Sequence, residues 1–118
     1  MAAYLFTYRV AKTPLREVLA ELDEAARAER LSAWNDWFES MEASVIERGQ
    51  PVADAHEIGN CGSETRIGGY SLVTADNLEE AFRMATGCPG VAWGGGVEVG
   101  ELMELPLSPS KQEVSARV

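Results

Sequence analysis

The order in which strand-like and helix-like patterns follow one another constrains the fold of this chain more than any other feature. Residues 3 to 10 alternate, with Tyr4, Phe6 and Tyr8 on one face, which indicates a strand rich in β-formers. A helical region, two strand-like stretches, a second helix and a last strand follow in turn. This order predicts a single α+β domain over residues 1 to 105, of the ferredoxin-like β-α-β-β-α-β type with an antiparallel sheet.

The long helical region carries two apolar stripes, the first ending at Ala26 and the second beginning at Leu31. At about 100° per residue, the second stripe is rotated by roughly 120° from the first. One straight helix would not bury both stripes against the same sheet. We therefore expect a break between residues 28 and 32, with Ser32 as the new N-cap, and an end at Gly49.

The strands in the middle of the chain differ in regularity. Residues 51 to 58 form a weak pattern that would place Asp54 and His56 on one strand face. Residues 67 to 75 form a clear strand pattern that includes two successive glycines, Gly68 and Gly69. A glycine pair inside a strand predicts a bulge or a close backbone approach.

The second half of the chain ends in a helix, a strand and a tail. A capping box that begins at Asp76 starts the helix, and Gly87 ends it. The last strand is expected over residues 97 to 105, with a bulge at Gly100. Residues 106 to 118 are polar and contain turn-forming residues, so we expect a loosely ordered C-terminal tail.

Composition and charge exclude several classes of protein. Ten Lys and Arg against nineteen Asp and Glu give a net charge of −9, which disfavours nucleic-acid and anionic membrane partners. The sequence shows neither a signal peptide nor a membrane-spanning apolar run, so a cytoplasmic location is expected. Cys61 and Cys88 form no C-x-x-C pair and are expected to be reduced, although a disulfide between them stays open and their role is unassigned.

The two predicted helical regions are enough to cover only one face of the sheet. The first and third strands nevertheless carry apolar or aromatic residues on both faces. An uncovered apolar sheet face is unfavourable in a monomer, so we expect a second copy of the chain to cover it.

Short motifs in this order resemble a known family. The segment of residues 31 to 105 contains a tryptophan-rich helix, a tyrosine-serine strand, an aspartate-capped helix, a Gly-Cys-Pro turn, a glycine run and a Val-Glu-Val strand. They are Ala33-Trp34-Asn35-Asp36-Trp37-Phe38, Gly49-Gln50-Pro51, Gly69-Tyr70-Ser71, Ala75-Asp76-Asn77-Leu78-Glu79, Gly87-Cys88-Pro89, Gly94-Gly95 and Val97-Glu98-Val99. With these motifs the chain is similar to the YCII-related family, also called the DGPF domain.

The resemblance implies a homodimer of the dimeric α/β-barrel type. Most members of the family have no assigned activity, and a few relatives act on small cyclic or aromatic compounds with a histidine-aspartate pair. This chain departs from the family pattern, because Arg48 stands at the aspartate of the Asp-Gly-Pro-Phe signature and Val52 at its phenylalanine. The family's histidine near the first helix is also missing, so the catalytic pair is not carried over to this sequence.

His56 is the only histidine and the natural candidate for a general acid or base. Asp54, at about 7 Å on the same strand face, and Asp36, on the helix, are the candidates to modulate it. The competing interpretation is an ordinary solvated histidine, which one His beside one Asp does not exclude. Candidate ligand-binding residues are the aromatic and hydroxyl side chains Trp37, Tyr70, Ser71 and Trp93.

Two classes of function therefore stay open. The first is a cofactor-free isomerase or lyase that uses acid–base chemistry on a small cyclic compound. The second is a non-catalytic module that binds a small ligand or a protein partner. No cofactor or metal is expected, since Asp54, His56 and Glu57 would not share one strand face and the chain has no second histidine.

Overall fold

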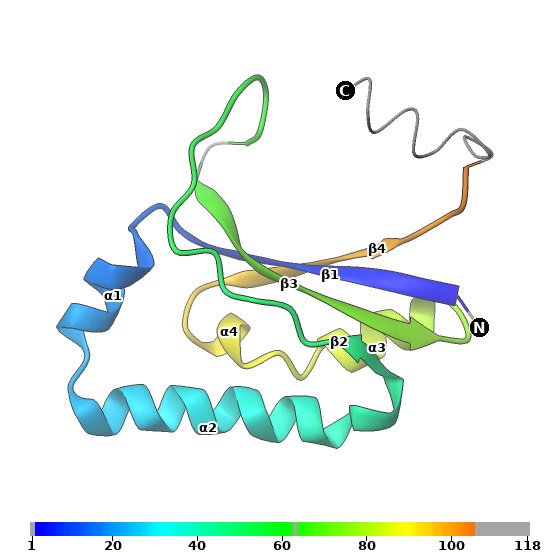
Figure 1. Ribbon diagram of the computed structural model, residues 1–118, viewed down its shortest axis with the longest axis horizontal. Helices are drawn as coiled ribbons and strands as arrows, with labels where there is room; N and C mark the ends of the chain where they lie inside the picture. The colour runs from blue at the N-terminus through cyan, green and yellow to red at the C-terminus, as the bar shows by residue number, and fades with distance from the viewer. Residues whose placement is uncertain (1, 63, 106–118) are drawn as a thin grey trace.

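A computed structural model of the chain describes residues 2–62 and 64–105. Four antiparallel strands form one sheet in the order β2-β3-β1-β4, an α+β arrangement compatible with a ferredoxin-like fold (Figure 1). The elements in chain order are β1 (Ala2–Ala11), α1 (Leu15–Glu21), α2 (Glu24–Ser40), the 3-10 turn η1 (Glu42–Ser44), β2 (Val45–Glu47), β3 (Thr65–Ala75), α3 (Leu78–Ala85), α4 (Pro89–Ala92) and β4 (Gly96–Glu101). The predicted tail, residues 106 to 118, lies outside the described residues.

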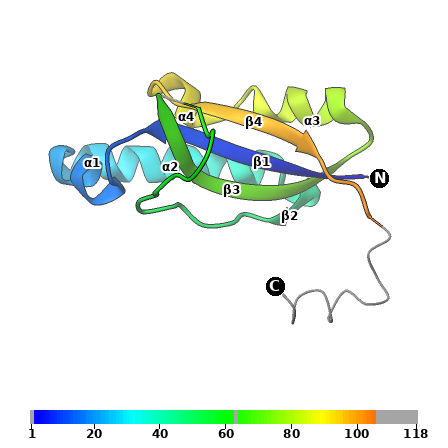
Figure 2. The same cartoon turned by 90° about the horizontal axis from the view of Figure 1, so that it is seen from above.

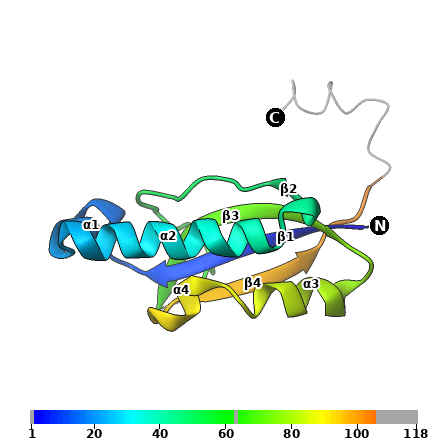
Figure 3. The same ribbon diagram turned by 90° about the horizontal axis from the view of Figure 1, so that it is seen from below.

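The helices lie on one face of the sheet. Figure 2 shows the strands in front of α2, α3 and α4, and Figure 3 shows the same helices in front of the strands. The core fills the space between these layers, because the inward-facing residues of β1 and β3 meet the aromatic side chains of α2 there. Its large buried members are Tyr4, Phe6, Tyr8, Trp37, Phe38 and Val73.

The predicted glycine bulge in β3 is confirmed. Tyr8 pairs with Gly69 and Arg9 pairs with Ile67, so Gly68 is the extra residue on β3. A Cβ atom at Gly68 would lie 2.5 Å from Cγ1 of Val10, which explains why a residue without a side chain is needed. The bulge predicted at Gly100 is wrong, because Gly100 pairs with Leu5 in an unbroken register.

The helical region is broken as predicted, but at a different place. α1 ends at Glu21, and Asp23 is the N-cap of α2, with Oδ1 accepting a 2.7 Å hydrogen bond from the Ala26 amide. The extended backbone of Leu22 separates the two helices. Ser32 therefore lies inside α2, because the aspartate cap upstream had already started a new helix. α2 ends at Ser40 rather than near Gly49.

The second strand is the main error of the sequence prediction. β2 is the short segment Val45–Glu47, in which Val45 pairs with Val73. Residues 51 to 58 pair with β3 only through a Pro51–Gly69 bridge and a hydrogen bond from the Val52 amide to the Gly68 carbonyl. The Val52 carbonyl accepts a hydrogen bond from the buried Arg66, and the Ala53 carbonyl accepts from Arg66 and from the Leu15 amide, so the segment leaves the sheet as a loop.

The last two elements lie close to their predicted positions. Asn77, not Asp76, is the N-cap of α3, with Oδ1 accepting from the Glu80 amide at 2.8 Å. The Glu80 carboxylate accepts from the amide of Asp76, the residue before the N-cap, so the helix cap lies one residue later than predicted. α3 ends before Gly87 as predicted, and β4 ends at Glu101 rather than at residue 105.

Candidate functional site

The predicted acid–base residues lie in the loop between β2 and β3. His56 and Asp54 are both exposed there, and no strand holds their side chains on a common face. Oδ1 of Asp54 accepts a 2.9 Å hydrogen bond from the amide of its neighbour Ala55. Farther along the loop, Glu57 forms a 2.8 Å ion pair with Lys12. The strand on which we expected His56 and Asp54 to share a face is therefore not formed, and their pairing stays a prediction.

Asp36 lies on α2, and the structure does not bring it to His56. α2 belongs to the helical layer, whereas the β2–β3 loop projects beyond the sheet on the opposite side (Figure 1). The sheet thus separates the two segments within one chain. The sequence suggested this pair only because the direction of the loop was unknown.

Two of the candidate ligand-binding residues are part of the core. Trp37 is buried, its ring centroid lies 5.1 Å from that of Phe38, and its indole N–H donates to the Met84 carbonyl at 3.2 Å. Ser71 is fully buried at 0% exposure. Trp37 therefore holds α2 against the end of α3. The side chains of Trp37 and Ser71 are both too buried to contact a ligand from solvent.

Ser71 forms a buried chain of hydrogen bonds. The Tyr8 hydroxyl donates to Ser71 Oγ at 2.7 Å, and Ser71 Oγ donates to the Arg48 carbonyl at 2.5 Å. Burial raises the pKa of Tyr8, the hydrogen bond between Tyr8 and Ser71 opposes that rise, and the nearby Cys88 thiol adds to it. Tyr8 is thus a neutral hydrogen-bond donor that links β1, β3 and the segment after β2.

The other two candidates lie at separate places on the surface. The Tyr70 hydroxyl donates to Glu47 Oε2 at 2.6 Å, and this bond, together with the charge of Glu47, raises the pKa of Tyr70. Since Tyr70 and Ser71 are adjacent in β3, Tyr70 faces the side of the sheet without helices. Trp93 follows α4, and the Arg30 guanidinium lies 4.6 Å from its ring centroid. The four predicted ligand-binding residues do not form one cleft within the chain.

Arg66 is a buried arginine at the start of β3 that no sequence pattern had indicated. It is only 4% exposed, and its terminal nitrogens donate to carbonyls of Thr13, Val52, Ala53 and Ile67. Arg66 forms no ion pair within the described residues. In the same part of the chain, its Nε is the one buried side-chain nitrogen or oxygen without a hydrogen-bond partner. A guanidinium balanced by carbonyl dipoles therefore ties the β2–β3 loop to the corner between β1 and α1.

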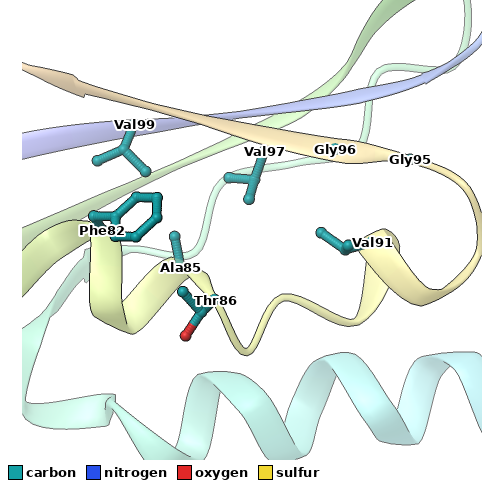
Figure 4. A pocket seen from close by; sticks show the side chains of 8 residues that line it. All are labelled: Phe82, Ala85, Thr86, Val91, Gly95, Gly96, Val97 and Val99. Atoms are coloured by element: carbon teal, nitrogen blue, oxygen red, sulfur yellow. The ribbon is translucent and has the colours of Figure 1, made fainter.

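A second missed feature is a groove between α3 and β4, which we call the α3/β4 groove. Figure 4 shows its side chains converging on the space between the helix and the strand. It consists of two adjoining hollows of about 440 and 400 Å³ that share three apolar residues. Its lining residues are Leu78, Glu79, Phe82, Ala85, Thr86, Val91, Gly95, Gly96, Val97 and Val99.

The sequence did contain a signal for this groove. Ala81 and Ala85 are buried and let α3 lie close to the sheet, whereas Leu78 and Phe82 lie to one side of that contact and stay exposed. All four residues formed one apolar stripe in the sequence. The signal is the difference in side-chain size between the two alanines and the pair Leu78 and Phe82, and an analysis of periodicity alone does not take side-chain size into account.

The described part of the chain contains no group of three or more His, Cys, Asp or Glu side chains placed to hold a metal ion. None of its helices is long and apolar enough to cross a membrane. Comparison with known proteins finds no family model that matches the chain, and no curated protein matches it either.

Proposed function

We propose that this chain is the protomer of a homodimeric binding module, in which the helix-free faces of two sheets pack together and shape a cleft for a small ligand. The proposal rests on one observation, which is that apolar side chains lie on the sheet face that no helix covers. Leu5 and Leu72 pair directly with one another on that face, on either side of the central β1–β3 ladder. A second copy of the face would remove both from water.

The segments that flank this face also carry exposed apolar residues. Ile58 is 93% exposed in the β2–β3 loop, and Met103 is 78% exposed just after β4. Both segments extend from the sheet on the side away from α2 (Figure 1). Isolated apolar side chains at such exposure gain most from burial against a partner. The resemblance to the YCII-related family, whose fold is a dimeric barrel, supports the same arrangement.

Light scattering at micromolar concentration tests the assembly. We expect a mass of about twice 12.8 kDa. Leu72→Lys, which places a charge on the helix-free face, should give a monomer of the same fold. Leu31→Lys is the matched control, because Leu31 is 64% exposed on α2, and it should leave the dimer intact. A monomeric wild-type protein, or a Leu72→Lys variant that still dimerises, would overturn the proposal.

The second candidate is a cofactor-free isomerase or lyase, in which His56 moves the proton and Asp54 modulates it. It is favoured by the position of both residues in the loop that borders the proposed dimer cleft. NMR titration of His56 separates the two functions. A histidine that titrates as a free imidazole and keeps its signals when small cyclic compounds are added supports the binding module. A perturbed titration with ligand-dependent shifts, and turnover that His56→Ala abolishes, would support the enzyme.

A further inference from the structure

The α3/β4 groove lies next to an edge of the sheet. β4 is the last strand in the order β2-β3-β1-β4, so among residues 2–62 and 64–105 only one of its sides is paired. Phe82 is 63% exposed on α3 and faces Val97 and Val99 of β4 across the groove (Figure 4). The molecule therefore presents exposed apolar side chains directly beside the free side of a strand.

The backbone groups on that free side follow from the register. The Leu102 amide donates to the Ala3 carbonyl at 3.0 Å, so the residue pairs that exchange hydrogen bonds with β1 continue at Gly100, Glu98 and Gly96. The N–H and C=O groups of Val97 and Val99 consequently point away from β1. These are the same two residues whose side chains line the groove. A strand added here would meet backbone donors and acceptors and an apolar hollow together.

The charges along this edge decide between possible occupants. Glu98 and Glu101 are exposed on β4, and the one charged residue that lines the groove is Glu79. Pairing the β4 edges of two copies would gather two sets of these carboxylates along one ladder, where like charges are destabilising. A cationic strand meets the opposite situation, because its side chains would lie beside carboxylates.

We propose that β4 is a docking edge for an extended peptide segment in which apolar and basic residues alternate. The segment adds to β4 as an antiparallel strand and continues the sheet. Its apolar side chains enter the α3/β4 groove against Phe82, Val97 and Val99. Its basic side chains lie on the other face, beside Glu98. The groove and the unpaired side of β4 do not involve the helix-free face, whereas Glu98 lies at the edge of that face. Strand addition at β4 is therefore tested by peptide binding and not by the oligomeric state.

The probe is the acetylated and amidated hexapeptide Lys-Ile-Lys-Ile-Lys-Ile, added to the full-length protein and followed by amide NMR shifts and calorimetry. We expect the largest shifts at residues 96 to 101 and in α3, with affinity that falls as salt is raised. The peptide Glu-Ile-Glu-Ile-Glu-Ile has the same apolar residues and should bind about tenfold more weakly or less. Equal binding of the two peptides would overturn the role of the acidic edge.

Backbone methylation separates strand addition from simple apolar binding. In antiparallel pairing, the isoleucines that enter the groove also direct their N–H groups toward β4, whereas the lysine N–H groups point away. Methylating the isoleucine amides should therefore weaken binding by about tenfold or more, and methylating the lysine amides should change it by less than about twofold. If both methylated peptides bind as well as the parent, no strand is added and the proposal fails.

Variants of the protein give the matching test. Phe82→Ala should weaken peptide binding by about tenfold, since an exposed ring contributes to binding but little to the core. Leu31→Ala, a truncation at nearly equal exposure on α2, should bind as the wild type does. Glu98→Lys should remove the preference for the basic peptide. If Phe82→Ala instead halves the mass seen by light scattering and the peptide does not bind, the groove holds a second copy and the proposal is wrong.

Discussion

The Tyr8 hydroxyl donates a 2.7 Å hydrogen bond to Ser71 Oγ across the two central strands, in a part of the core from which water is excluded. Ser71 passes the interaction on to the Arg48 carbonyl. The two hydroxyls are not equivalent, because the Tyr8 hydroxyl donates one hydrogen bond, whereas the Ser71 hydroxyl both accepts one and donates one. This asymmetry gives the first prediction.

We expect Ser71→Ala to destabilise the fold more than Tyr8→Phe. Tyr8→Phe removes a donor and leaves Ser71 bonded to Arg48, so it should cost about 1 kcal/mol in the free energy of unfolding. Ser71→Ala leaves the Tyr8 hydroxyl buried without an acceptor, which costs about 1–3 kcal/mol. Urea unfolding measures both values. The double variant should lose less than the sum of the two, and strict additivity would mean that the two groups are not coupled.

The same tyrosine makes stability depend on alkaline pH. Burial raises the pKa of Tyr8 above that of a tyrosine in the unfolded chain, which is about 10. Above that pH the unfolded state loses a proton that the folded state keeps, so stability falls as the pH rises. Tyr8→Phe should reduce this fall by up to about 1.4 kcal/mol per pH unit. Urea unfolding between about pH 9 and 11, roughly one unit either side of the unfolded pKa, tests the difference.

Removing the buried guanidinium should be among the most destabilising changes in this chain. Arg66→Met leaves the carbonyls of Thr13 and Val52 without their arginine donor, and the loss should be roughly 3 kcal/mol. Arg66→Lys should recover only part of it, since an ammonium lacks the planar fork that reaches several carbonyls. Arg16→Met, at an exposed arginine of α1, is the control and should change stability little. Equal effects at the two positions would contradict the assigned role.

Two glycines have nearly the same backbone conformation, so a comparison of alanine substitutions at both separates the cost of a steric clash from the cost of backbone strain. Gly49 has φ +77° and Gly59 has φ +74°, but a Cβ atom would collide with the Tyr70 carbonyl oxygen only at Gly49. Gly59→Ala should cost about 1–2 kcal/mol, the penalty of a left-handed conformation. Gly49→Ala should cost clearly more and shift the NMR signals of Tyr70. Similar losses at both sites would show that the backbone around Gly49 relaxes freely.

The two cysteines should differ in reactivity. Cys61 is exposed, whereas Cys88 is buried and burial raises the pKa of its thiol. Because the thiolate is the reactive form, a disulfide reagent should titrate one thiol rapidly in the folded protein and two in urea. Mass spectrometry should place the rapid adduct on Cys61. Rapid modification of Cys88 under native conditions would show that the core around α4 opens readily.

The sheet could be predicted where side chains alternate strongly. Tyr4, Phe6 and Tyr8 on β1 and Ser71 and Val73 on β3 follow the two-residue period, so both central strands were located within about two residues. β2 could not be found this way, because three residues are too short to show a period. Its place depends on Val45 filling the core and on Arg66 holding the next carbonyls away from the ladder.

The candidate site was harder to predict than the fold. His56 and Asp54 were paired by assuming that a strand carries them, and that assumption failed when the chain left the sheet after Pro51. The α3/β4 groove depends on how far Phe82 lies from the centre of the helix–sheet contact. That offset is set by the packing of Ala81 and Ala85 against the sheet, which is a tertiary property rather than a local one.

The pairing of β1 with β3 also bears on how fast the chain folds. Ala2 pairs with Ala75 and Ala11 with Thr65, so the central ladder joins segments that are 73 and 54 residues apart in sequence. No turn between neighbouring segments can start this ladder. The loop must close before most of the core contacts form, and chains with many such non-local pairings fold more slowly than helical bundles. During synthesis, the first strand emerges well before the partner that covers its edge, so β1 is the segment most exposed to aggregation.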